Sequence, residues 1–246
     1  GDHQDVMAAR QTGFAMFFSG SVQEVMDLSA VPHLATLESR IPFMNIFDGF
    51  RTSHEIQKVE EMSQDDLIPL VNQEALKGFR DRALNPENPV TRGTAQNDDI
   101  YFQGREAQNK HYDAVVEVVA DYMKKISEIT GREYAPFTYY GDPEADRVII
   151  AMGSVTETIK DTIDEMAKEG EKVGVIKVHL YRPFSPKYLK AVLPATAKKI
   201  AVLDRTKEMG ATGEPLYLDV CSVIRDADTL VIGGRYGMGS KDTTPQ

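Results

Sequence analysis

The clearest pattern of hydrophobic and polar positions lies in the second half of the chain. Four short runs there are almost wholly apolar, as buried strands are, at residues 148–152, 173–178, 200–204 and 230–234. Between them, apolar residues recur three and four positions apart, which is typical of helices, at residues 155–166, 186–193 and 216–224. Strands that alternate with helices form βαβ units, so this half is predicted to hold a mostly parallel sheet.

The first 34 residues are predicted to be helical, with one interruption. Apolar residues from Met7 to Phe17 lie among small residues and indicate a first helix, which the sequence Ser19–Gly20–Ser21 interrupts. Ser21 is the expected N-cap of a second helix that runs to Leu34, with Glu24 in the position of a capping-box partner. A short apolar run at residues 42–47 then predicts a buried strand.

The segment from residue 50 to residue 112 has the weakest periodicity in the chain. Short helices are expected at residues 55–62 and 65–76, and residues 91–104 show no period at all. A loop of this length inside a compact domain is uncommon, so we expect an ordered arm that packs on a partner or on a site. The arm leads into a long amphipathic helix over residues 105–130, which Gly131 is placed to end.

Prolines and glycines between residues 132 and 143 indicate a linker, which divides the chain into two domains. The prediction is a first domain with its arm at 1–130, a linker at 131–145, a second domain at 146–240 and the start of another linker at 241–246. The chain begins with Gly1 rather than methionine, and an apolar helical pattern follows almost at once. We therefore expect the sequence to be a piece of a longer protein.

Composition and charge exclude several classes of function. The chain has 28 basic and 38 acidic side chains and a net charge of −10, which argues against nucleic acid or an anionic membrane as a partner. No apolar run approaches the roughly 20 residues that span a bilayer. One cysteine, Cys221, cannot form an intramolecular disulfide or a four-cysteine zinc or iron–sulfur site. A reducing, cytoplasmic location is expected.

Two loops concentrate ionisable side chains near predicted element ends. His3 and Arg10 flank the first helix; the acidic residues beside them suit a helix N-terminus, but the loop could also face a ligand. Arg51 and His54 follow the strand at residues 42–47, where the alternative is an ordinary helix cap. No metal site is expected.

Gly153–Ser154 joins a predicted strand to a predicted helix. Such a junction can present backbone N–H groups to an anion, although a tight connection is the commoner explanation.

Five motifs in order resemble the pyruvate:ferredoxin (flavodoxin) oxidoreductase family. They are Gly-Asp-His-Gln-Asp-Val-Met-Ala-Ala-Arg-Gln-Thr-Gly at 1–13, Asp-Gly-Phe-Arg-Thr-Ser-His-Glu at 48–55, Ile-Tyr-Phe-Gln-Gly-Arg-Glu-Ala at 100–107, Tyr-Arg-Pro-Phe at 181–184 and Gly-Gly-Arg-Tyr-Gly at 233–237. The resemblance spans essentially the whole chain. It implies an α/β fold in which a truncated thiamine-pyrimidine-binding-type domain precedes a parallel-sheet domain similar to the transketolase C-terminal domain.

The resemblance also implies a function for a larger parent protein. Members of the family decarboxylate pyruvate on thiamine diphosphate with magnesium, pass electrons through [4Fe-4S] clusters to ferredoxin or flavodoxin, and form acetyl-CoA from CoA. The substrate contacts, the glutamate that activates thiamine, the diphosphate site and the clusters would lie outside residues 1–246. No catalytic residue is therefore assigned, and His3, Arg10, Arg51 and His54 are candidates for lining the thiamine side or for packing against other domains.

Three hypotheses follow from the sequence. The first is a fragment of the pyruvate enzyme that is inactive alone and whose partners are the remaining domains of the parent. The second is a fragment of a relative that acts on another 2-oxoacid such as 2-oxoglutarate, and the third is a non-catalytic assembly module. Because a truncated sheet leaves an unpaired edge, self-association as a dimer is expected.

Overall fold

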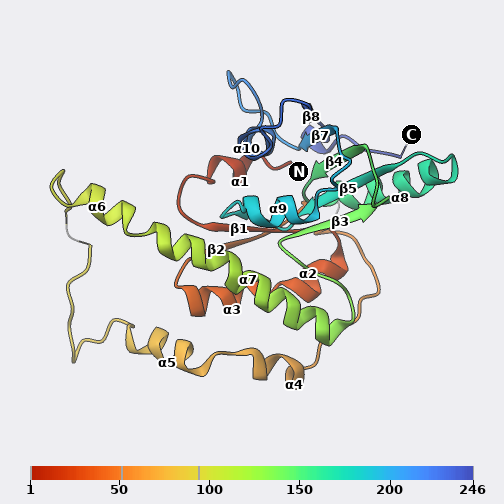
Figure 1. Ribbon diagram of the computed structural model, residues 1–246. Coiled ribbons are helices and arrows are strands. Elements are labelled where there is room, and N and C mark those ends of the chain that lie inside the picture. Colours follow the sequence, from red (N-terminus) through yellow and green to blue (C-terminus); the bar gives the residue numbers. More distant parts are fainter. Residues whose placement is uncertain (1, 51, 94, 246) are drawn as a thin grey trace.

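The computed structural model describes residues 2–50, 52–93 and 95–245 and contains two sheets (Figure 1). The first sheet has the order β2-β1-β6. Its strands β1 (Ala15–Ser19) and β2 (Phe43–Phe47) are parallel, with Ala15 beside Phe43 and Ser19 beside Phe47. The third strand, β6 (Leu180–Arg182), comes from the second half of the chain and runs antiparallel to β1. The two halves therefore share a sheet.

The second sheet confirms the predicted α/β class. Its order is β3-β5-β4-β7-β8, and all its strands are parallel except β3, which lies antiparallel to β5. The strands are β3 (Phe137–Gly141), β4 (Arg147–Ala151), β5 (Val173–Val178), β7 (Lys199–Asp204) and β8 (Leu230–Arg235). The four predicted strands correspond to β4, β5, β7 and β8.

Helices cover both faces of this sheet. α8 (Val155–Lys168) packs on one face through Val155, Ile159 and Ile163. α9 (Pro186–Val192) and α10 (Pro215–Val223) pack on the opposite face, in a core that also contains Met16 and Phe18 of β1. The right-handed crossover rule explains the split, because the chain moves one way along the sheet through α8 and the other way through α9 and α10.

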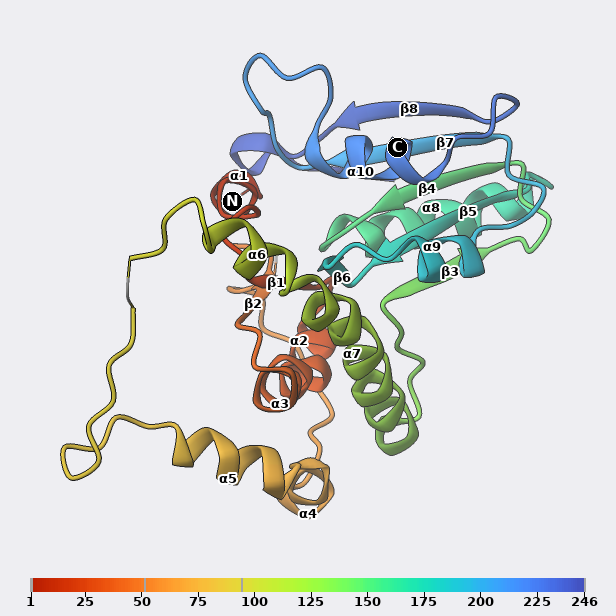
Figure 2. The ribbon, with the colours of Figure 1, turned by 60° about the vertical axis from the view of Figure 1, so that its left-hand side comes forward.

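A second core lies on the other side of the first sheet. It is formed by α2 (Val22–Leu28), α3 (Ala30–Ser39) and the long α7 (Asn109–Thr130), which lie together in Figure 2. α7 shows the three- and four-residue spacing that predicted it, because its buried residues include Val115, Val119, Tyr122, Met123 and Ile126. Gly131 ends it in the left-handed conformation, at φ 71°, as the sequence indicated.

The predicted first helix is wrong over most of its length. Only α1 (Gln4–Ala8) is helical, and Ala15 to Ser19 form β1 instead. All five residues of β1 are buried because helices cover one face of the sheet and the second half covers the other. An apolar run buried on both faces has no alternation, so periodicity alone could not separate this strand from a helix.

The structure differs from the sequence predictions at three further places. Ser21 caps α2 as predicted, but the Glu24 carboxylate accepts the N–H of Gly20 rather than that of Ser21, so the capping box is incomplete. The predicted helix at residues 55–62 does not form. Residues 137–141, which the prolines and glycines placed in the linker, form β3 at the edge of the second sheet.

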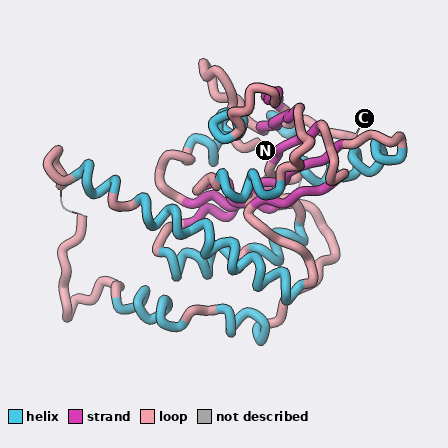
Figure 3. The backbone as a smooth tube through the Cα atoms, in the orientation of Figure 1, coloured by secondary structure: helices cyan, strands magenta, loops and turns pink. Residues whose placement is uncertain are grey.

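The predicted arm at residues 91–104 belongs to a longer segment, Glu55 to Gln108, whose outer part stands away from the rest of the molecule (Figure 3). This longer segment contains α4 (Gln64–Leu67), a 3-10 turn at Ile68–Leu70, α5 (Gln73–Asp81) and α6 (Tyr101–Glu106). Met62, Leu67 and Leu70 anchor its first part on the core beneath the first sheet. Over the described ranges, the structure holds no helix that is both long enough and apolar enough to cross a membrane.

Candidate functional site

The strongest concentration of buried polar groups lies where the carboxyl ends of strands from both sheets meet. Asp48 directly follows β2, Ser154 begins the turn into α8, and Arg205 directly follows β7. Asp48 Oδ2 accepts the Ser154 backbone N–H at 2.5 Å, and Asp48 Oδ1 lies 3.1 Å from Arg205 Nη1. The Gly153–Ser154 junction does bind an anion, and that anion is a carboxylate of the same chain.

His3 completes this cluster. Its Nε2 lies 2.6 Å from Asp48 Oδ1, and because a carboxylate accepts, Nε2 is the protonated nitrogen that donates. The His3 backbone N–H donates to the Arg205 carbonyl at 2.9 Å, which fixes the start of the chain against β7. His3 is 4% exposed, and its ring lies 5.3 Å from that of Phe18. The cluster of His3, Asp48, Ser154 and Arg205, here called the junction cluster, joins the two halves.

Electrostatics keep Asp48 ionised. Burial alone would raise the pKa of this carboxyl, but the hydrogen bond and charge of His3, together with the Ser154 hydrogen bonds, hold it well below the ordinary value of 3.8. Asp48 is 3% exposed. A carboxylate that accepts three donors and is closed to solvent is not available to exchange protons with a substrate, so its role here is to hold the halves together.

Gly153 is required by the same cluster. Its φ is +81°, and an added Cβ would lie 2.7 Å from Asp48 Oδ2 and 3.2 Å from the His3 ring. Gly210 has nearly the same φ, +79°, but an added Cβ there meets nothing within 4 Å. A comparison of the two glycines therefore separates the cost of backbone strain, which both positions share, from the cost of a steric clash, which arises only at Gly153.

Gly153→Ala is therefore expected to cost more than Gly210→Ala. Backbone strain in the left-handed region contributes about 1–2 kcal/mol to both variants. Only Gly153→Ala also displaces the buried carboxylate, so its loss of unfolding free energy should be at least about twice as large. Urea denaturation of both variants measures this. Equal losses would show that the junction cluster tolerates displacement.

Asp204, the last residue of β7, lies close to the cluster but has a different role. Its carboxylate accepts the N–H groups of Leu216 and Tyr217 at 2.9 and 3.1 Å and thereby caps α10. Burial raises the pKa of Asp204 to about 6. Since the residue is 1% exposed and committed to the helix, it serves the fold rather than a substrate.

An open cavity of about 460 Å³ lies beside the junction cluster. Its lining includes Gly20, Ser154, Arg205 and Tyr236, which follow β1, β4, β7 and β8 respectively. Open α/β sheets bind ligands outside the carboxyl ends of their strands, so this cavity has the place in the fold where a ligand is expected. Acidic Glu55 and Glu157 line it as well as basic Arg205 and Lys241, which gives no single charge preference.

Of the three sequence candidates that the structure describes, His3 alone lies in the cluster. His3 is central to it, whereas Arg10 forms an ion pair with Glu208 at 2.7 Å and donates to the Met7 carbonyl. That pair also links the two halves, because Glu208 lies beyond β7. His54 is exposed and bonds Ser53 Oγ at 2.7 Å. Arg51 lies outside the described residues.

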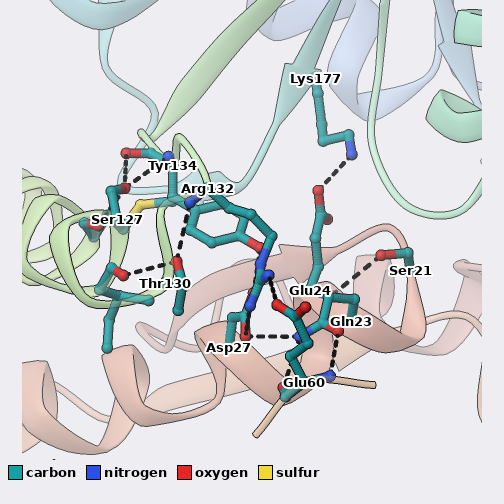
Figure 4. Close-up of polar contacts among 12 residues, drawn as sticks. Ser21, Gln23, Glu24, Asp27, Glu60, Ser127, Thr130, Arg132, Tyr134 and Lys177 are labelled. Atoms are coloured by element: carbon teal, nitrogen blue, oxygen red, sulfur yellow. Dashed lines mark hydrogen bonds and ion pairs between the residues drawn. The ribbon is translucent and has the colours of Figure 1, made fainter. Parts of the chain in front are cut away.

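A second buried network joins α2 to the second sheet (Figure 4). Lys177 on β5 is 2% exposed, and its Nζ lies 2.6 Å from Glu24 Oε1 and also contacts Glu157 of α8. Burial alone would raise the pKa of Glu24, but His179 and Lys177 hold it well below the ordinary value of 4.5. Burial opposes the charge of Lys177, and the two glutamates outweigh it and raise the pKa of this amine. Charges from both halves therefore neutralise one another.

Arg132 connects the same helix to the base of the arm (Figure 4). Its Nε and Nη2 lie 2.6 and 3.1 Å from the two carboxylate oxygens of Asp27, which is fully buried, and Tyr134 Oη donates to Asp27 at 2.6 Å. Arg132 Nη1 also donates to Glu60 Oε2 at 2.6 Å. Because a two-pronged arginine–carboxylate pair restricts geometry strongly, Arg132 fixes the direction in which the arm leaves the molecule.

Sequence reasoning missed Asp48, Arg205 and Lys177 as central residues. Asp48 and Arg205 each directly follow an apolar strand, so the rule that strand carboxyl ends carry function would have found both. Lys177 is the single charged residue in the otherwise apolar run at 173–178, and a charge in a buried strand signals a buried partner. The partners themselves, Glu24 and Glu157, are distant in sequence and needed the structure.

The described residues do not fit the inorganic groups that thiamine-dependent electron-transfer chemistry uses. Iron–sulfur clusters need several cysteine thiolates, and the chain has Cys221 alone, half-buried on α10. Across the described ranges, no three His, Cys, Asp or Glu side chains are grouped to hold a metal ion. Among the described residues, the site is a polar junction with an adjacent cavity, and no group of three such side chains is placed there to hold a metal ion.

Comparison with solved structures identifies a related fold. The fold is similar to that of 2-oxoglutarate:ferredoxin oxidoreductase from Magnetococcus marinus, with a TM-score of 0.57 over 99% of this chain and 43% of that one. The two sequences are 17% identical, so this likeness shows the fold alone. This chain therefore shares its architecture with a segment of that enzyme.

Two family models match this chain in order. Residues 1–124 match the thiamine diphosphate-binding region of pyruvate flavodoxin/ferredoxin oxidoreductase, and residues 145–246 match core domain II of pyruvate:ferredoxin oxidoreductase. The chain belongs to the pyruvate flavodoxin/ferredoxin oxidoreductase family, a family of oxidoreductases.

Curated relatives of the same family match this chain over its whole length. It is 58% identical over 247 residues to the pyruvate:ferredoxin oxidoreductase of Moorella thermoacetica. It is also 58% identical to the pyruvate-flavodoxin oxidoreductase of Enterobacter agglomerans and 52% identical to that of Rhodospirillum rubrum. In each case the match covers 100% of this chain but only 21% of the relative. The chain thus spans about a fifth of the length of the relatives it matches.

Proposed function

We propose that this chain acts within a larger thiamine diphosphate-dependent enzyme that oxidatively decarboxylates pyruvate and reduces ferredoxin or flavodoxin. The observation that carries the proposal is the identity of 58% to pyruvate enzymes, sustained over the whole chain. The alternative substrate 2-oxoglutarate rests on a likeness in fold alone. The chain by itself is proposed to be inactive.

The part that this chain plays follows from the geometry of its junctions. Residues 1–130 are proposed to be the C-terminal part of the domain that receives the thiamine pyrimidine, and residues 146–240 the following domain, with the linker at 131–145. The junction cluster and the Lys177 network would hold these domains in fixed relation, which keeps the open cavity in position. Residues that line the thiamine side would be correctly placed only while the two domains keep this relative position.

Other components of the proposal belong to the rest of the enzyme. Magnesium and CoA, like thiamine diphosphate and the [4Fe-4S] clusters, would be bound by polypeptide beyond this chain, in a cytoplasmic enzyme. The partners would be those other domains and, through them, ferredoxin or flavodoxin. Self-association as a dimer is also proposed, because no described strand pairs with the outer edge of β2.

A segment exchange tests the proposed function. This chain would replace the equivalent 247 residues of the Moorella thermoacetica enzyme, and viologen reduction would be measured with pyruvate, CoA and thiamine diphosphate. We expect pyruvate-dependent reduction by the hybrid and none by the isolated chain. An exchange variant with exposed Asp161→Asn serves as the matched control for any substitution made in the junction cluster.

Two outcomes would count against the proposal. A hybrid that folds and carries its clusters, as its visible absorbance would show, yet reduces no dye with pyruvate would favour the assembly-module hypothesis. Dye reduction by the isolated chain would overturn the proposal that it is inactive alone. Calorimetric titration adds a further check, because measurable binding of thiamine diphosphate to this chain would count against the assembly-module hypothesis.

A further inference from the structure

Helices of the described ranges cover only part of one face of the second sheet. On the face that carries α9 and α10, Ile200 and Val202 of β7 are buried. On the other face α8 contacts β5 and β3, while Leu230 and Ile232 of β8 keep exposed fractions of 57% and 54%. Parallel sheets are normally covered by helices on both faces, so the area over β7 and β8 is expected to receive a further covering element.

An apolar groove of about 450 Å³ runs through this uncovered area. α8 contributes Ile163 and Met166 to its lining, β8 contributes Leu230 and Ile232, and β7 contributes Ala201. Aliphatic side chains on two sides of a groove suit the apolar stripe of an amphipathic helix. The groove therefore has the chemistry of a helix-packing surface.

The end of the chain already enters this groove. Lys241, Asp242 and Thr243 line the cavity at the carboxyl ends of the strands, Pro245 lines the apolar groove, and Thr244 lines both. The groove itself extends to the first residues of β4, β5, β7 and β8. The tail thus passes from the carboxyl edge of the sheet onto the face beside α8, which is the course that a helix takes after a parallel strand.

Thr244 and Pro245 are also the residue types with which helices begin. Threonine is a favoured N-cap because its hydroxyl accepts a free N–H of the first turn, and proline is favoured at the next position because its missing N–H would be unpaired there. α9 begins with the same kind of pair, Ser185 as N-cap and Pro186 as first residue, and α10 begins with Pro215. The last two described residues therefore repeat a helix start that this domain already uses.

We propose that the polypeptide following residue 245 in the longer enzyme forms a helix, with Pro245 as its first residue, that lies in this groove beside α8. Its apolar stripe would cover Leu230 and Ile232. The six residues of β8 span about 20 Å. A helix crosses that distance with about 13 residues, close to the 14 residues of α8, which crosses the same sheet.

This inference rests on the proposed function in one respect, that the chain belongs to a larger polypeptide. The chain spans 21% of the Moorella thermoacetica relative, which leaves ample length for such a segment. The inference does not depend on the substrate, on the cofactor or on the reaction.

Thiol labelling in the groove tests the inference. Ile232→Cys, combined with Cys221→Ser, would be made in the 246-residue chain, in a version extended by about 20 residues of the parent sequence, and in the complete parent polypeptide. We expect the thiol at position 232 to react with iodoacetamide at least about tenfold more slowly in both longer versions, because reaction then requires local opening of the new helix. Ile232 is half exposed in this chain, so the substitution should leave the fold intact.

Met209→Cys in the same background is the matched control. Met209 is 85% exposed on a loop away from the groove, so its replacement should react equally fast in all three versions. Far-ultraviolet circular dichroism adds an independent measurement, because the extended version should gain the signal of about 13 helical residues over the 246-residue chain.

Several outcomes would overturn the inference. Equal labelling of position 232 in the shorter and extended versions would show that the following segment does not cover the groove. Protection found only in the complete polypeptide would assign the groove to a distant domain, and protection of the 246-residue chain that rises with its concentration would assign it to a second copy. None of these results bears on pyruvate-dependent dye reduction by the hybrid, so failure of the inference is distinguishable from failure of the proposed function.

Discussion

Asp48→Asn is expected to lower the free energy of unfolding by about 3–5 kcal/mol, because it removes one partner of a buried ion pair and leaves Arg205 without its carboxylate. The substitution preserves shape, so loss of packing contributes little. An asparagine would also turn an amide donor toward either the Arg205 or the Ser154 donor, and His3 would lose its charged acceptor. Urea denaturation followed by circular dichroism measures the change.

The pH dependence of this effect has a definite sign. The pKa of Asp48 is lower in the folded chain than its ordinary value of 3.8. A carboxyl of this kind contributes stability that is fully present above its unfolded pKa and is lost as the pH falls through the folded value. The difference in stability between the native chain and Asp48→Asn should therefore be constant near neutral pH and should narrow below about pH 4.

Asp161→Asn is the control for this prediction. Asp161 is exposed on α8, so its substitution should change the unfolding free energy by less than about 0.5 kcal/mol. An equally small change in unfolding free energy for Asp48→Asn would show that the junction cluster does not hold the two halves together. The proposed fixed relative position of the domains would then lose its main support.

Local patterns predicted most elements of the second half, because those elements have the periodicity that a sequence pattern can detect. β4, β5 and β7 are short apolar runs, and α8 has a clear apolar stripe. β1 and β3 escaped prediction for opposite reasons. β1 is buried on both faces and so lacks alternation, whereas β3 lies between Pro136 and Pro143, whose signals favoured a linker. β6 is only three residues long.

The site was less predictable because its members come from separate elements. His3 was identified as a candidate from its neighbours, but its acceptor Asp48 is 45 residues away. Nothing local indicates that the turn after β4 would receive that carboxylate, since a plain connection is the commoner explanation of the Gly153–Ser154 sequence. The contact depends on how the two sheets meet, and that arrangement is a property of the tertiary fold.

The junction cluster and the Lys177 network hold the two halves of the chain together in the same way. In both, a buried charge from one half of the chain is paired with a charge from the other, so removing one partner leaves a buried ion without that pairing. Apolar contacts alone would tolerate small rotations, whereas charge-assisted hydrogen bonds have narrow distance and angle limits. The networks thus favour one relative orientation of the halves, which is what a cavity lined from both of them requires.

Lys177→Met is expected to cost about 3–5 kcal/mol of unfolding free energy, the second large effect in the molecule. Methionine fills a similar volume, but Glu24 would remain buried without the ammonium that lay 2.6 Å away, and His179 Nε2, at 3.5 Å, would be its remaining partner. Because the native pKa of Glu24 lies below 4.5 and that of Lys177 lies above 10.5, the contribution of the pair is fully present between those values. It is lost as the pH moves beyond either limit.

A double-mutant cycle separates the energy of the Lys177–Glu24 ion pair from the energy lost when the packing of the Lys177 side chain changes. Glu24→Gln keeps an oxygen that can accept the Gly20 N–H, so Lys177→Met combined with Glu24→Gln removes both charges while retaining that bond. When both partners of a buried pair become neutral, the penalty of an unpaired ion disappears, and the double variant should be more stable than Lys177→Met alone. Strictly additive losses in urea denaturation would mean that the two charges do not interact, and that packing around β5 holds the halves in place.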